Sequence, residues 1–302
     1  MSDQLLEAPK SRTGLYAVIA AVVAVALVVG GYFLFIRDSS DAIRIGVVDS
    51  SDPYWRDFTQ AADEAGLDVE IVNFADYNQP NRALDEGELD LNQFQHLAFL
   101  AEHLEANPES DIVPIGATAI YPLALYSENY GSIEEIPDGA EVVVPNDPSN
   151  QARALVILQD AGLIELADGG TLTSDLSQVD EAASRVQVTE AAANFTAASL
   201  QDVAAAVINN DFIKDAGLDP EAALAQDDPE DERAQPYINI FAANAEDADN
   251  EDYLELVRIY HDTQKVQDGV LDASEGTAVL LDTPTAELDA ALDEAREAVR
   301  NG

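Results

Sequence analysis

Cysteine is absent from this chain of 302 residues, and basic residues are scarce. The absence of cysteine excludes disulfides, a thiolate nucleophile, a zinc–sulfur site and a cysteine that carries a lipid. The 14 Lys and Arg residues face 59 Asp and Glu residues, which gives a net charge of −45. Nucleic-acid binders need clustered Lys and Arg to displace the counterions of phosphate, so the charge balance excludes that class of partner. Hydrophobic residues still make up 47% of the chain, which is enough to form folded cores beneath an acidic surface.

The sequence signatures of enzymes and cofactor sites are also missing. Only three histidines occur, His96, His103 and His261, and none belongs to an HxxxH or HExxH pattern. The GxSxG pattern of hydrolases and the glycine-rich patterns of nucleotide-binding loops are absent as well. Pairs of acidic residues carry no information in so acidic a chain. We therefore expect a protein that is not an enzyme and that uses no cofactor or metal.

One uncharged run, residues 14–36, is long enough to cross a membrane as a helix. It contains 23 residues, whereas a spanning helix needs about 20. A cleavable signal peptide is the alternative, but its apolar region is usually about 7–15 residues and ends at small residues. This run ends in aromatic residues, which favours an uncleaved anchor. We predict a cytoplasmic N-terminus (1–13), a transmembrane anchor (14–36), a linker (37–42) and then an extracytoplasmic domain.

Beyond the linker, strand and helix patterns alternate. Residues 43–48 and 69–74 read as buried strands, and the segment 54–66 between them has helical spacing and ends at Gly66. Strand, helix and strand at this spacing predict a βαβ unit with parallel strands. Further strands are expected at 89–92, 112–116, 121–126, 141–145, 185–188, 205–208 and 236–241. Further helices are expected at 80–86, 96–105, 151–161, 199–204, 252–262 and 285–300.

Because the βαβ pattern begins a second time at residue 141, we predict an α/β fold with two lobes. The first lobe comprises residues 43–126 and 236–302, and the second comprises residues 127–235. Strands near 121–127 and 236–242 are the candidates for crossing between the lobes. Ligands of such folds bind at the carboxyl ends of the strands and between lobes.

The most informative segment is PNDPSNQARAL, residues 145–155. It combines a strand end, a turn and a helix start, at which Ser149 or Asn150 is expected to cap the helix. The N–H groups of the first turn then face an anionic group. Arg153, expected in that turn, has the planar guanidinium that suits a carboxylate. The alternative is an arginine solvated on the helix surface.

Two other segments carry polar or aromatic residues of interest. Asn209 and Asn210 end a predicted strand, where ligands bind in α/β folds. Phe94, His96 and Phe99 either belong to a core or form an apolar wall for a ligand side chain.

In their order and spacing these segments resemble the methionine-binding protein family of ABC importers, also called the NlpA lipoprotein family. The matching stretches are residues 43–48, 69–87, 89–99, 121–127, 136–163, 200–220 and 235–240. The resemblance implies a two-lobe periplasmic-binding-protein-like fold of type II that closes on a free amino acid, typically methionine, and that works with ABC permease and ATPase subunits.

The resemblance also assigns roles to individual residues. Arg153 matches the arginine that binds the ligand carboxylate, and Asn209 matches the asparagine that holds the polar head of the amino acid. The aromatic wall is represented by Phe94, His96 and Phe99, and Asn150, Tyr77 and Asn239 lie in family motifs near the cleft.

This chain departs from the family pattern at the aromatic wall and at the anchor. Gln93 and Phe99 replace two tyrosines of the family motif, so another apolar amino acid or a methionine-containing dipeptide stays open beside methionine. The cysteine that carries the lipid is absent, and residues 14–36 are expected to take over its tethering role. A membrane-anchored sensor or interaction domain that kept the fold but lost transport is the second functional hypothesis.

Overall fold

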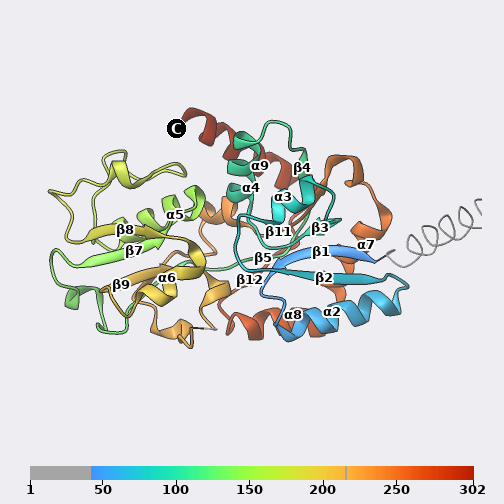
Figure 1. The fold of residues 1–302 in the computed structure, drawn as a ribbon, viewed down its shortest axis with the longest axis horizontal. Coiled ribbons are helices and arrows are strands. Elements are labelled where there is room, and N and C mark those ends of the chain that lie inside the picture. The colour runs from blue at the N-terminus through green and yellow to red at the C-terminus, as the bar shows by residue number, and fades with distance from the viewer. Residues whose placement is uncertain (1–41, 215) are drawn as a thin grey trace, which may run out of the picture. The chain divides into compact units, whose positions relative to one another are not determined.

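The computed structural model describes residues 42–214 and 216–302 (Figure 1). Residues 43–302 form one compact unit. The predicted anchor, residues 14–36, lies outside the described residues. Among the residues that are described, no helix combines the length and the apolar character needed to cross a membrane.

The first sheet has five strands in the order β2-β1-β3-β11-β4. Strand β1 (Ile43–Val48) pairs in parallel with β2 (Val69–Phe74) and with β3 (Leu91–Asn92). Strand β11 (Ile240–Asn244) lies antiparallel between β3 and β4 (Ile112–Ala117). The predicted βαβ unit is therefore present, with α2 (Pro53–Glu64) connecting β1 to β2.

Helices cover both faces of this sheet (Figure 1). On one face α4 (Leu97–Ala106) and α9 (Thr285–Asn301) bury leucines against the strands, with α3 (Pro80–Asp85) beside them. On the other face α2, α7 (Glu251–Asp262) and α8 (Gln264–Ala273) enclose the aromatic core of Trp55, Phe58 and Tyr260. A small ladder of β5 (Ala119–Ile120) and β12 (Val279–Leu280) completes this half.

The second sheet has the order β10-β6-β9-β7-β8. Its strands are β10 (Ala225–Gln226), β6 (Ala124–Tyr126), β9 (Ala205–Ile208), β7 (Glu141–Pro145) and β8 (Gln187–Ala191). Strand β7 is parallel to both of its neighbours, whereas β6 is antiparallel to β9. Val142 and Val144 pack against α5 (Pro148–Asp160), and Val143 faces the cluster that includes residues of α6 (Ala193–Ser199) and Leu200. This alternation along β7 buries both faces of the sheet.

Two of the expected elements are wrong. The helix expected at 199–204 lies earlier, because α6 ends at Ser199 and the chain turns there to enter β9. The strand expected at 236–241 begins only at Ile240, and residues 232–237 form a 3-10 helix instead. Pro236 lacks a backbone N–H, so it cannot join a strand ladder as a donor. Helix α8 was not predicted from the sequence.

The chain passes from the first sheet to the second between β5 and β6 and returns between β10 and β11. The segments that follow β2, β3, β7 and β9 all contribute residues to one cavity. The carboxyl ends of parallel strands from both sheets thus meet at a common place, as the topology of α/β folds requires for a ligand site.

Candidate functional site

The cavity at these strand ends holds every residue that the sequence analysis selected for a ligand site. It measures about 440 Å³ including its open mouth. Its lining includes Tyr77, Phe94, His96, Phe99, Asn150, Arg153, Asn209 and Asn239. The structure therefore brings all eight together, although they span more than 160 positions of the sequence. Asn210, noted beside Asn209 at the strand end, also lines the cavity. Five further lining residues were not predicted from the sequence: Gln95, Tyr121, Pro122, Leu123 and Asp211.

Aromatic rings form one wall of the cavity. The rings of Tyr77, Phe94 and Phe99 lie with centroids 5.7–6.1 Å apart, in tilted and edge-on arrangements. Phe212, from the second half of the molecule, adds a fourth ring 5.5 Å from Tyr77. Such geometries are favourable for aromatic pairs. The wall offers an apolar surface that contains no formal charge.

His96 is neutral and held in one tautomer by the start of α4. It caps this helix, and its Nδ1 accepts a hydrogen bond of 3.1 Å from the backbone N–H of Phe99. The proton must therefore lie on Nε2, which donates to Oδ1 of Asn150 at 3.2 Å. Burial, together with the charge of Arg153, lowers the pKa of His96 to about 3. An isolated β-bridge to Asn239 places that residue beside His96.

Asp147, rather than Ser149 or Asn150, caps helix α5, so the expected cap is wrong. Its Oδ1 accepts from the backbone N–H of Asn150 at 3.0 Å and from the Asn150 side chain at 2.7 Å. The helix begins at Pro148, because proline suits the first helical position. Arg153 consequently lies in the second turn and not in the first. Its position in the cavity depends on its own side chain and not on the N-terminus of the helix.

The amide of Asn150 connects the two halves of the site. Its Oδ1 accepts from His96 and also from Nδ2 of Asn209 at 3.0 Å. This bond orients Asn209, whose Oδ1 is buried without a hydrogen-bond partner among the described residues. A buried acceptor without a partner costs free energy, on the order of 1–3 kcal/mol. This oxygen is therefore a position at which a ligand donor would be stabilised.

Arg153 is 5% exposed and firmly held. Its Nε donates to Oδ2 of Asp227 at 2.6 Å, and one Nη donates to the carbonyl of Tyr121 at 2.8 Å. The guanidinium carbon lies 4.2 Å from the centroid of the Tyr237 ring. Asp227 also accepts from the backbone N–H of Leu123, in the segment that crosses between the sheets. No hydrogen bond of the other Nη is found among the described residues, and Arg153 lines the cavity.

Asp211 is an acidic member of the cavity that the sequence analysis did not identify. The hydroxyl of Tyr77 donates to its Oδ2 at 2.7 Å. Burial, and secondarily repulsion from Asp49 and Asp52, raises the pKa of Asp211 to about 7, although the bond from Tyr77 opposes the shift. Its place two residues beyond Asn209, at the end of β9, is the only sequence signal that distinguishes it from other acidic residues.

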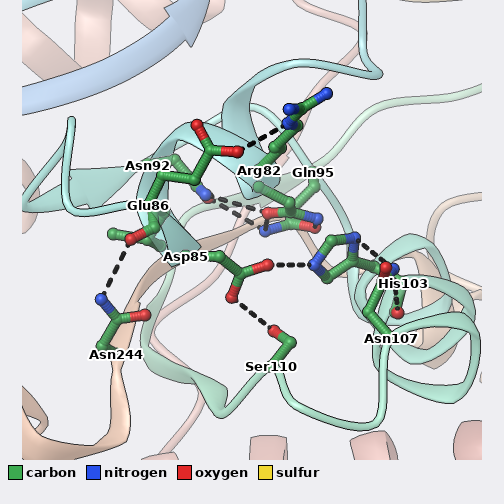
Figure 2. A network of polar contacts seen from close by, with 11 residues as sticks. Arg82, Asp85, Glu86, Asn92, Gln95, His103, Asn107, Ser110 and Asn244 are labelled. Carbon is green, nitrogen blue, oxygen red and sulfur yellow. Dashed lines mark hydrogen bonds and ion pairs between the residues drawn. The ribbon is translucent and has the colours of Figure 1, made fainter.

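A network of side-chain amides and carboxylates supports the segment before α4 (Figure 2). Gln95, which lines the cavity, donates to Asn81 at 2.6 Å and to Asn92 at 2.9 Å, and Asn81 donates back at 2.7 Å. This network fixes the backbone that carries Phe94 and His96.

Beside it, the carboxylate of Asp85 bonds to both His103 and Ser110 (Figure 2). The distances are 2.8 Å to Nε2 of His103 and 2.7 Å to Oγ of Ser110. Because the carboxylate lies between the serine and the histidine, the imidazole does not contact the hydroxyl that it would have to activate. This order differs from a nucleophilic triad, in which the histidine is in the middle.

Known proteins share this fold and sequence. The sequence pattern of the NlpA lipoprotein family matches residues 43–280. A probable D-methionine-binding lipoprotein MetQ of Haemophilus influenzae is 36% identical over 218 residues, which cover 72% of this chain and 78% of that protein. The crystal structure of protein PG110 from Staphylococcus aureus has a TM-score of 0.79 at 35% identity, covering 84% of this chain and 99% of that one.

A second solved structure, of a nutrient-binding protein from Burkholderia cenocepacia bound to methionine, has a TM-score of 0.73 at 33% identity. The match covers 79% of this chain and 99% of that one. Both structural matches share the α/β two-lobe periplasmic-binding-protein-like fold. The family pattern and the extent of these identities place the chain, as a binding protein and not an enzyme, in the NlpA lipoprotein family.

Proposed function

We propose that this protein is the substrate-binding component of an ABC importer and that it captures a free amino acid, with methionine favoured. The observation that carries the proposal is that one cavity combines groups for a carboxylate, for an amine and for an apolar side chain. A guanidinium held by Asp227 lies on one side, and the buried Oδ1 of Asn209 and an aromatic wall complete the lining. The similarity to proteins named for methionine binding supports the choice of ligand.

The geometry suggests a role for each lining residue. Arg153 binds the ligand carboxylate through the Nη that its bonds to Asp227 and Tyr121 leave, because a charge-assisted hydrogen bond to a carboxylate is strong. Asn209 accepts from the amino group, and Asn150 keeps Asn209 in the required orientation through the 3.0 Å bond. The ligand side chain packs on Tyr77, Phe94 and Phe99, with neutral His96 and Asn239 at the edge of this wall.

Closure of the two halves about the crossing segments completes the proposed cycle. Hinge closure around a ligand changes the surface that a binding protein presents to its membrane partner. Here that partner is proposed to be an ABC permease with its ATPase subunits. No bond is made or broken in the ligand, so the protein captures and delivers its cargo unchanged.

The proposal includes the placement of the domain. We expect residues 14–36 to anchor the chain as a single-pass helix, with residues 1–13 in the cytoplasm and the domain on the other side of the membrane. The division into residues 43–126 with 236–302 and residues 127–235, and the type II subclass of the fold, remain predictions.

The test is ligand binding by the full chain, purified in a mild detergent. A thermal-shift screen of L- and D-amino acids and methionine-containing dipeptides identifies the ligand, because binding to the native state raises Tm by mass action. Calorimetry then compares the wild type with Arg153→Ala. Loss of a charged contact inside a buried site costs about 2–5 kcal/mol. We therefore expect at least about a thirtyfold loss of affinity.

Two further variants separate binding from folding. Arg153→Ala leaves the carboxylate of Asp227 without its partner, so Arg153→Ala with Asp227→Asn is expected to recover stability but not affinity. Arg185→Ala removes an arginine that bonds to Asp138 and does not line the cavity, and it should bind as the wild type does. Unchanged affinity in Arg153→Ala would refute the role proposed for this residue.

The other hypotheses are tested by two different observations. A sensor or interaction domain that lost transport lacks adjacent genes for a permease and an ATPase. Replacement of the tyrosines by Gln93 and Phe99 is the specific reason to test other apolar amino acids and dipeptides. The ligand that gives the largest Tm increase decides between methionine, another apolar amino acid and a dipeptide.

A further inference from the structure

The carboxylate of Asp211 has no basic partner within residues 42–214 and 216–302, although it lines the proposed ligand cavity. Its hydrogen bond comes from the neutral hydroxyl of Tyr77. Arg153, in the same cavity, is already paired with Asp227, at 2.6 Å. The charge of Arg153 is therefore balanced by that of Asp227, whereas no positive charge balances that of Asp211.

The groups around Asp211 make this imbalance larger. Asp49 and Asp52, at the end of β1 and before α2, repel its negative charge. The charge of Asp211, after burial, is among the causes that raise the pKa of Tyr54 and of Tyr121, so these neighbours supply no positive charge. Burial is the main reason why its pKa rises to about 7. A partly buried carboxylate in such surroundings is stabilised by a cation that enters the cavity.

An unsatisfied acceptor on another residue that lines the same cavity points to the same kind of ligand group. Oδ1 of Asn209 is buried and without a partner in the described part of the chain, and Asn209 precedes Asp211 by two residues at the end of β9. A primary ammonium group has three donors and one positive charge. It therefore offers both the donor that Oδ1 of Asn209 lacks and the positive charge that the Asp211 carboxylate lacks, whereas a water molecule supplies no charge.

We propose that Asp211 determines specificity by binding the ammonium group of the ligand together with Asn209. This inference rests on the proposed function. It adds that the cavity binds each charged group of a zwitterion with a side chain of the opposite charge. Arg153 takes the carboxylate, and Asp211 takes the amine. The cavity then binds ligands with a primary amino group more tightly than N-acylated and des-amino analogues.

A different role for Asp211 is a latch between the two halves of the molecule. Tyr77 follows β2 of the first sheet, and Asp211 follows β9 of the second, so their 2.7 Å bond joins the halves. A latch favours closure around any ligand and changes all affinities by the same factor. Recognition of an ammonium group changes only the affinities of ligands that possess one.

The experiment uses this difference. The full chain in detergent is titrated with methionine, N-acetylmethionine and the des-amino analogue 4-(methylthio)butanoic acid. Wild type is compared with Asp211→Asn, which removes the charge but keeps an acceptor for Tyr77, and with Tyr77→Phe, which removes the latch bond. Asp63→Asn, on the exposed side of α2, is the control for loss of one negative charge.

We expect Asp211→Asn to weaken methionine binding at least tenfold and to leave the affinity for the des-amino analogue unchanged or higher. Tyr77→Phe should keep the wild-type ratio between the two ligands, and Asp63→Asn should match the wild type. If Asp211→Asn keeps the wild-type ratio of the affinities for methionine and the des-amino analogue, Asp211 does not bind the amine. The proposed function would still stand in that case, because the wild type binds methionine.

If the des-amino analogue binds neither protein, the comparison with Tyr77→Phe decides. Equal losses of methionine affinity in the two variants overturn the inference, and a larger loss in Asp211→Asn supports it. A wild type that binds no amino acid refutes both the inference and the proposed function.

Discussion

At the scale of single residues, burial moves the pKa values of His96 and Asp211 in opposite directions. It lowers that of His96 to about 3 and raises that of Asp211 to about 7, because in each case it penalises the charged form. His96 is thus a fixed neutral donor near neutral pH. Asp211 is the group in the cavity whose charge state changes there.

The raised pKa of Asp211 makes a prediction for stability without ligand. An unfolded aspartate titrates near 3.9, whereas the folded group titrates near 7. Between these values the folded state holds a proton that the unfolded state has released. The contribution of Asp211 to the free energy of unfolding therefore falls as the pH rises from about 4 to about 7, and it is constant above that range.

Asp211→Asn cannot titrate and should remove this contribution. The variant is expected to gain Tm relative to the wild type as the pH is raised from about 4 to about 8, measured by thermal unfolding without ligand. Asp63→Asn, which replaces an exposed carboxylate, should show no such trend. A difference between Asp211→Asn and wild type that does not vary with pH would contradict the shift.

At the scale of elements, the cap of helix α5 links folding to the site. Asp147 accepts bonds from both the backbone and the side chain of Asn150, and Asn150 in turn orients Asn209. Loss of a helix cap costs about 0.5–2 kcal/mol. The carboxylate of Asp147 therefore stabilises the start of helix α5. Through its bond to Asn150, it also supports Asn209, a proposed ligand contact.

Asp147→Ala is expected to lower the free energy of unfolding by about 1 kcal/mol and to weaken ligand binding, because the Asn150 amide loses its fixed orientation. Urea unfolding and calorimetry measure the two effects. Asp147→Ser restores a capping oxygen and should recover most of the stability. If Asp147→Ala binds the ligand with wild-type affinity, the cap does not organise the site.

The elements also show what the sequence could predict and why. The βαβ unit at β1, α2 and β2 was predictable, because apolar strands flank a helix that stops at Gly66, where φ is 87°. The cap of α5 was misplaced because Asp147, Ser149 and Asn150 are all good caps, and only the backbone geometry chooses among them. The 3-10 helix at 232–237 is too short to show a helical periodicity in the sequence, so Pro236 was assigned to the strand that follows it.

The residues of the cavity were predictable for a different reason. Arg153, Asn209 and the aromatic wall follow from a resemblance in motifs, and the fold brings them together. Asp211 could not be selected in this way, because it is one of 59 acidic residues and its environment forms only when Tyr77 approaches from the other half. The contact between Tyr77 and Asp211 joins residues 134 positions apart, and local sequence patterns do not predict contacts of that separation.

At the scale of the whole molecule, charge is the dominant property. Residues 43–302 carry 55 of the 59 acidic residues and 11 of the 14 basic ones, a net charge of −44. Of the nine residues proposed to bind the ligand only Asp211 is acidic, so nearly all of this charge lies elsewhere in the chain. Self-repulsion on this scale opposes the compact state.

Carboxylates on helix α9 show this repulsion locally. Asp289 and Asp293 lie four residues apart on the helix, and both are exposed. Partial burial and the charge of Asp293 raise the pKa of Asp289. Like charges at this spacing destabilise a helix by a few tenths of a kcal/mol. Repeated over the surface, such pairs make stability depend on screening by salt.

We therefore expect Tm to rise by more than about 5 °C between about 0.01 M and about 1 M NaCl, because the Debye length falls from about 30 Å to about 3 Å. The double variant Asp289→Asn with Asp293→Asn should unfold at a higher temperature than the wild type at low salt, and the two should converge at high salt. Thermal unfolding of the full chain across this range measures both effects. A Tm that does not change with salt, or a gap between variant and wild type that is constant across the range, would show that the packed cores and not the surface charge limit the stability of this domain.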